Sequence, residues 1–64
     1  MDIKDKIYNL RKTSGLSQED LGFKLGVSRQ TVSKWEAGFV QPSFENLKSL
    51  CEVFQVSLSY FEEV

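Results

Sequence analysis

The chain has 64 residues, of which 41% are hydrophobic and 12% aromatic; this suits one small packed domain and excludes a disordered segment. It has a formal net charge of −1, no histidine and one cysteine, Cys51, which excludes an intramolecular disulfide and the usual zinc ligand sets. Residues 1–6 contain no apolar run, so neither a signal peptide nor a membrane span is expected. The composition predicts a cytoplasmic domain that needs no metal and no cofactor.

Charge is distributed unevenly along the chain. Residues 1–34 carry seven Lys and Arg against four Asp and Glu, a net charge of +3, whereas residues 35–64 carry −4. The stretch 21–34 holds three cations and no anion. A local positive charge of this kind favours an acidic partner although the whole chain is slightly negative.

The first half of the sequence predicts two short helices. Over residues 2 to about 12, apolar residues recur at helical spacing, and Ser14-Gly15 ends the pattern. Ser17 then stands at an N-cap position, with Asp20 three residues later as an acidic capping box. The second helix buries Leu21 and Leu25 and ends at Gly26.

Three more helices are predicted after Gly26, and no segment has the alternation of a strand. The third is capped by Ser28, buries Val32 and Trp35, and ends at Gly38. Pro42-Ser43 begins a fourth, and Ser57 begins a short fifth that contains Leu58 and Phe61. The apolar stripe of the fourth helix comprises Phe44, Leu47, Leu50, Cys51 and Phe54.

The connection between the second and third helices is only about three residues long, Gly26-Val27-Ser28, which is typical of a helix-turn-helix. At about 100° per residue, Gln30, Ser33 and Lys34 face away from the buried side of the third helix, and Arg29 can reach round from its flank. This face has no carboxylate; Arg and Lys can donate to guanine, and Gln can bond adenine bidentately. The alternative is an ordinary solvated helix face, but the capped preceding helix, the short turn and the local cations favour DNA recognition.

Two segments resemble a known family. "SQEDLGFKLGVSRQTVSKWEAG" resembles the helix-turn-helix of the lambda-repressor and Cro type, also called the Xre family, and "PSFENLKSLCEVFQVSLSYF" resembles that family's last two helices. The similarity covers essentially the whole chain. It implies an all-α, compact five-helix bundle in which the second helix lies across the DNA backbone and the third enters the major groove.

The resemblance also implies roles for individual residues. Gln18 matches the family's phosphate-contacting glutamine, and backbone amides around Ser43 and Phe44 match a further phosphate contact, consistent with anion binding at helix N-termini. Lys24 is an additional phosphate candidate from its charge and proximity. Arg11 and Glu36 both lean towards the interior, where the family has a structural ion pair. The positions that match base-contacting residues are Ser28, Arg29, Gln30, Ser33 and Lys34.

Some positions depart from the family pattern. Phe23 points outward where a polar residue is usual, and Gly22 stands where alanine is common. Phe39 and Val40 add apolar surface after the third helix, and together with Tyr60 they predict a dimer contact. Glu62 and Glu63 are expected to be solvated.

These features predict a DNA-binding transcriptional regulator encoded by a bacterium or phage, with residues 1–64 forming one helix-turn-helix domain. The resemblance to this family favours a repressor that binds a palindromic double-stranded operator as a homodimer, at least on DNA. Two alternatives stay open: an antitoxin or protein-interaction module of the same fold, and the N-terminal domain of a longer regulator. The lack of histidine, of a phosphate-binding glycine loop and of a convergent carboxylate pair argues against an enzyme.

Overall fold

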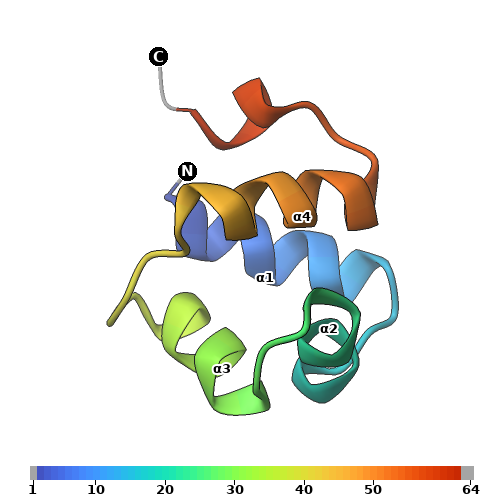
Figure 1. The fold of residues 1–64 in the computed structure, drawn as a ribbon, viewed down its shortest axis with the longest axis vertical. Helices are drawn as coiled ribbons and strands as arrows, with labels where there is room; N and C mark the ends of the chain where they lie inside the picture. Colours follow the sequence, from blue (N-terminus) through green and yellow to red (C-terminus); the bar gives the residue numbers. More distant parts are fainter. Residues whose placement is uncertain (1, 63–64) are drawn as a thin grey trace.

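A computed structural model describes residues 2–62, which form an all-helical domain (Figure 1). Its elements are α1 (Ile3–Thr13), α2 (Gln18–Leu25), α3 (Arg29–Ala37), α4 (Phe44–Phe54) and a 3₁₀ turn, η1 (Leu58–Phe61). No strand occurs in this part of the chain, as the sequence predicts. The expectation for Glu63 lies outside the described residues, and Glu62 is exposed.

Every element contributes to one hydrophobic core. Helix α2 packs against both α3 and α4, α1 packs against α3, and η1 packs against α4. The buried hydrophobic residues that form this core are Ile7, Leu21, Val32, Trp35, Leu50 and Phe61. Because α2 and α3 are both anchored in this core, the angle between them is fixed by packing as well as by the turn that joins them.

The predicted fifth helix is wrong: the segment after α4 forms a single 3₁₀ turn instead of an α-helix. Its backbone bonds run from Tyr60 N–H to the Ser57 carbonyl, at 3.0 Å, and from Glu62 N–H to the Ser59 carbonyl, at 3.1 Å. A four-residue element offers too few α-type bonds to offset helix nucleation, so the tighter turn is favoured. It still buries Phe61, which closes the core over α4.

Phe44 does not belong to the buried stripe of α4, which corrects the prediction from periodicity. Its side chain is 61% exposed, whereas Leu50 is fully buried. Phe44 is the first residue of the helix and lies about 120° around the axis from Leu50 at 100° per residue. The Nζ atom of Lys48 lies over its ring, 5.7 Å from the ring centroid.

The half-buried Cys51 lies on the inner side of α4 and packs against the core. Burial, and then the charge of Glu52, raise the pKa of the Cys51 thiol, which keeps it in the less reactive protonated form.

Within residues 2–62, no helix is both long enough and apolar enough to cross a membrane.

Candidate nucleic-acid interface

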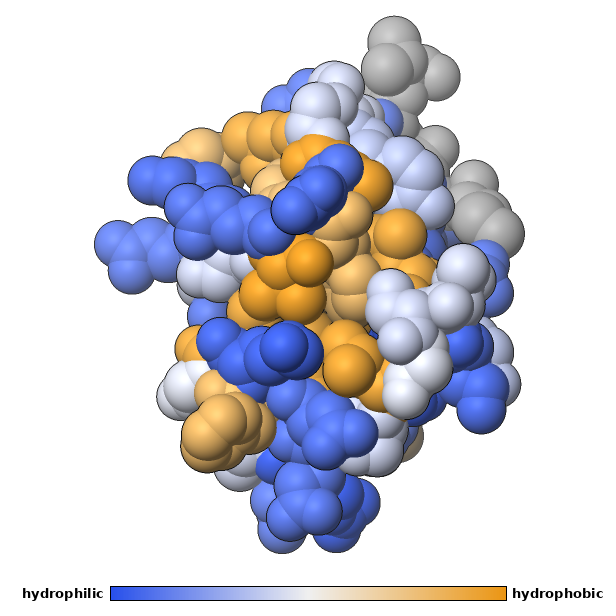
Figure 2. Space-filling view, turned by 90° about the vertical axis from the view of Figure 1, so that its right-hand side faces the viewer, coloured by the Kyte–Doolittle hydropathy of each residue, from blue (hydrophilic) through white to orange (hydrophobic). Residues whose placement is uncertain are grey.

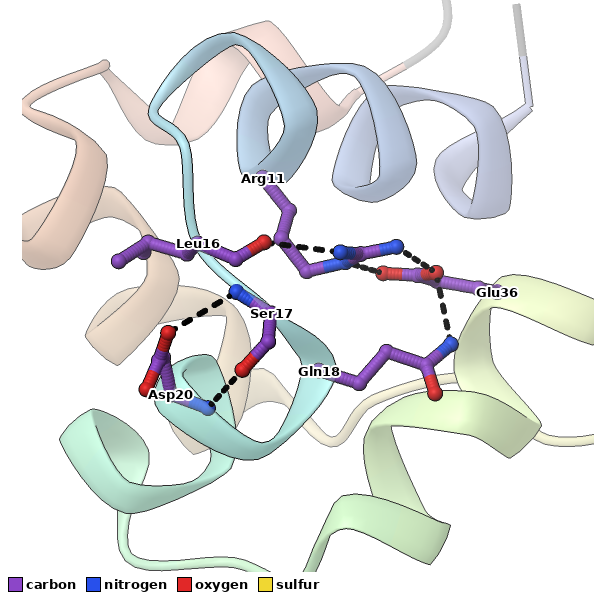
Figure 3. A network of polar contacts seen from close by, with 6 residues as sticks. All are labelled: Arg11, Leu16, Ser17, Gln18, Asp20 and Glu36. Carbon is purple, nitrogen blue, oxygen red and sulfur yellow. Dashed lines mark hydrogen bonds and ion pairs between the residues drawn. The ribbon is translucent and has the colours of Figure 1, made fainter.

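The start of α2 is fixed by the capping box that the sequence predicts (Figure 3). The amide of Asp20 donates to Ser17 Oγ at 2.9 Å, and the amide of Ser17 donates to Asp20 Oδ2 at 3.1 Å. The hydrogen bond from the Ser17 backbone holds the pKa of the Asp20 carboxyl below its ordinary range. Two amides that a helix start would leave unpaired are thereby satisfied, so α2 begins at a defined residue.

The turn between α2 and α3 depends on two glycines. Gly26 has φ +76°, a left-handed conformation that glycine adopts without steric cost, and the following Val27 N–H bonds the Gly22 carbonyl at 2.9 Å. At Gly22 itself, a Cβ atom would lie only 2.7 Å from the Val27 carbonyl oxygen. The sequence prediction missed this second role, although a glycine inside a short helix is itself a signal of close backbone approach.

The exposed side of α3 carries unpaired polar side chains. Arg29, Gln30 and Lys34 are exposed, and none of them has a hydrogen bond or ion pair with another described residue. Ser33 is half-buried. Ser28 caps the helix: its Oγ accepts the Thr31 amide at 3.1 Å and lies 3.0 Å from Thr31 Oγ1. Arg29, Gln30 and Lys34 are therefore exposed side chains of α3 whose donors are free among the described residues.

Arg11 and Glu36 form the ion pair that the family resemblance implies. Arg11 Nε donates to Glu36 Oε2 at 2.6 Å and Nη2 donates to Oε1 at 2.9 Å, with side chains only 9% and 6% exposed. The hydrogen bond that Arg11 donates to Glu36 raises the pKa of Arg11, against the opposing effect of burial. Arg11 Nη1 also donates to the Leu16 carbonyl at 2.8 Å. The pair ties α1 to the last turn of α3.

Gln18 forms a hydrogen bond with the Glu36 carboxylate of this ion pair. The sequence did not predict this contact. The Nε2 atom of Gln18 donates to Glu36 Oε1 at 3.0 Å (Figure 3). The first residue of α2 is thus connected through one carboxylate to α3 and α1. The signal that could have found it is the inward position of Glu36, a carboxylate whose two oxygens need more donors than one arginine supplies.

The remaining phosphate candidates lie on separate elements. Lys24, in the last turn of α2, lines an open hollow with Leu16, Glu19, Asp20 and Phe23. Ser43 caps α4 and accepts the Asn46 amide at 3.2 Å, so the amide of Phe44 stays among the unpaired groups of the helix start.

Several large apolar side chains are exposed. Phe23 is 88% and Phe39 80% exposed, while Val40 and Tyr60 are 51% and 39% exposed. Figure 2 shows a band of hydrophobic residues, flanked by hydrophilic ones, on the side of the molecule where α2 and the end of α4 lie in Figure 1. Patches of this kind on a small monomer mark candidate interaction surfaces.

A capped helix, a glycine turn and a second helix with an exposed polar side define a helix-turn-helix protein, and the comparison with known families agrees. Residues 7–61 match the helix-turn-helix family, and the chain belongs to that family. It is 40% identical over 58 residues to the HTH-type transcriptional activator BcrR of Enterococcus faecalis, covering 91% of this chain and 28% of BcrR.

Two other similarities span nearly the whole of both chains. The chain is 39% identical over 56 residues to YgzD of Bacillus subtilis, an uncharacterized HTH-type transcriptional regulator, and this match covers 88% of the chain and 85% of YgzD. The crystal structure of the P22 c2 repressor in complex with the synthetic operator 9T superposes with a TM-score of 0.89 at 33% identity. That alignment covers 95% of this chain and 92% of the repressor chain.

Proposed function

We propose that this protein is a sequence-specific double-stranded DNA-binding transcriptional regulator that inserts α3 into the major groove. The main support comes from the exposed side of α3, where Arg29, Gln30 and Lys34 offer unpaired donors. In addition, no carboxylate lies in residues 21–34. Arg and Lys recognise guanine, and Gln recognises adenine. Ser28 and Ser33 complete the proposed base-contacting set.

The proposed phosphate contacts come from helix N-termini. Gln18 begins α2, and the amide of Phe44 follows the cap residue Ser43 at the start of α4. Unpaired amides and the positive end of the helix dipole favour a phosphate at both places. Lys24 adds a cation to the same group of candidates.

We propose further that the protein represses transcription from a palindromic operator as a homodimer. The similarity to the P22 c2 repressor, whose structure contains an operator, supports repression, although BcrR is an activator. One small module buries little DNA surface, and two modules on half-sites about one helical turn apart combine their contacts. The exposed Phe39, Val40 and Tyr60 are the proposed contact between protomers.

Selection from a randomised duplex library at stated salt tests this function. The wild-type chain should enrich a palindrome, and Gln30→Ala or Lys34→Ala should lose about 1–3 kcal/mol on that site while relaxing its sequence preference. Gln18→Ala should weaken binding to specific and random duplex similarly, because a phosphate contact carries no sequence information.

Lys12→Ala is the matched control for Lys34→Ala, since it removes the same charge from an exposed position on α1. It should leave the selected sequence unchanged. Equal losses on specific and random duplex for Gln30→Ala and Lys34→Ala would refute base recognition by α3. A folded wild-type chain that enriches no sequence would instead favour a protein-interaction module of this fold.

A further inference from the structure

Gln18 is held in one orientation by its neighbour. Its amide nitrogen donates to Glu36 Oε1 at 3.0 Å, and a carboxylate can only accept hydrogen bonds. The amide therefore cannot turn over to put its carbonyl against Glu36. One N–H of the same nitrogen remains for another acceptor.

The orientation matters because a phosphate is also an acceptor. A glutamine free to rotate can also turn its carbonyl towards a phosphate, and this arrangement is repulsive. Fixing the amide before DNA arrives removes the wrong arrangement and reduces the side-chain entropy lost on binding.

The charge of Glu36 would itself repel a phosphate if it were not neutralised. Arg11 bonds both carboxylate oxygens, at 2.6 and 2.9 Å, and the pair is almost fully buried. The third guanidinium nitrogen of Arg11, Nη1, donates to the Leu16 carbonyl, just before α2. Arg11 therefore neutralises the charge of the Glu36 carboxylate and fixes the position of the backbone just before Gln18 (Figure 3).

We infer that Glu36 is a positioning residue for DNA binding: it orients the Gln18 amide so that its remaining N–H donates to a DNA phosphate, while Arg11 neutralises the carboxylate. This inference rests on the proposed function. It assigns the Arg11–Glu36 pair a role in recognition in addition to its role in joining α1 to α3.

A double-mutant cycle in DNA affinity tests the coupling. Gln18→Ala should weaken binding about tenfold in the wild-type chain, the cost of one hydrogen bond to a charged group. In an Arg11→Met, Glu36→Leu background, which replaces the ion pair with apolar side chains of similar size, the same change should cost less than about threefold. Equal fold-losses in the two backgrounds would overturn the inference, because a structural pair would not alter the contribution of Gln18.

The Gln18 side-chain amide can also be followed directly by NMR, its signal being the one that Gln18→Ala removes. In the wild-type chain its protons should be protected from solvent exchange before DNA is added and more strongly protected afterwards. Rapid exchange in the free protein would overturn the inference even if the apolar background fails to fold. If the wild-type chain binds no duplex at all, the proposed function fails; if it binds but the cycle shows no coupling, only the role of Glu36 fails.

Discussion

Gly22 is a helical residue whose missing side chain decides how closely α2 approaches the turn after it. Replacing glycine by alanine inside a helix usually stabilises a protein by about 0.5–1 kcal/mol. At Gly22 the new Cβ would lie 2.7 Å from the Val27 backbone oxygen, and a backbone atom cannot move without displacing the turn. We therefore expect Gly22→Ala to lower the free energy of unfolding, measured by urea denaturation.

The matched control lies next to it in the same helix. Phe23 is 88% exposed, so Phe23→Ala adds helix propensity to α2 without removing a buried contact. Its unfolding free energy should be unchanged or slightly raised. A gain in stability for Gly22→Ala similar to that of the control would show that the turn does not depend on the close approach at Gly22.

The helix α4 ends less favourably than the helices before it. Its C-cap residue, Gln55, has φ +56°, a left-handed conformation that costs a residue with a side chain about 1–2 kcal/mol. Gln55→Gly should therefore raise the thermal unfolding midpoint by about 4–8 °C, the shift that ~1 kcal/mol produces in a domain of this size. Gln41→Gly, at an exposed loop position without a positive φ, should not raise the midpoint; an equal rise in both variants would contradict the explanation.

The capping box of α2 gives stability a specific pH dependence. Since the Ser17 amide lowers the pKa of Asp20 in the folded protein, the carboxylate stabilises the fold above its unfolded pKa, and this contribution is lost as pH falls through the folded pKa. Asp20→Asn should unfold at a lower temperature than wild type at pH 7. The two midpoints should converge as the pH falls through the lowered folded pKa of Asp20, where the carboxyl becomes protonated. A difference that persists unchanged in acid would exclude the charge of Asp20 as its cause.

At the scale of the whole molecule, the sequence predicts those structural features that depend on residues close together in the chain. The caps at Ser17 and Ser28, the start of α4 after Pro42-Ser43, and the burial of Val32 and Trp35 follow from neighbouring residues, and the structure confirms them. Features that depend on distant residues are harder to predict. The bond from Gln18 to Glu36 joins positions 18 residues apart in the chain, and the exposure of Phe44 depends on where the core ends.

The proposed contact between two copies uses exposed apolar side chains near α1. Phe39 is 80% exposed, and Val40 beside it lines a hollow with Ile3 at the start of α1. Tyr60 is also joined to α1, because its carbonyl accepts a hydrogen bond from Lys6 Nζ at 2.8 Å. Both parts of the proposed dimer contact therefore lie next to residues in the first half of α1. Burying one phenylalanine contributes about 1.5–3 kcal/mol, and a two-fold contact buries it in both protomers.

Phe39→Ser should therefore weaken dimerisation at least about tenfold, measured by sedimentation at micromolar protein, and should reduce cooperative binding to two half-sites. Phe23→Ser is the matched control, because it removes an equally exposed aromatic side chain from α2 and should sediment like the wild type. If wild type and Phe39→Ser are equally monomeric or equally dimeric, the contact lies elsewhere. If only Phe23→Ser dissociates, the protomers meet through the hydrophobic side of α2, and the half-site spacing of the operator would have to follow from that geometry instead.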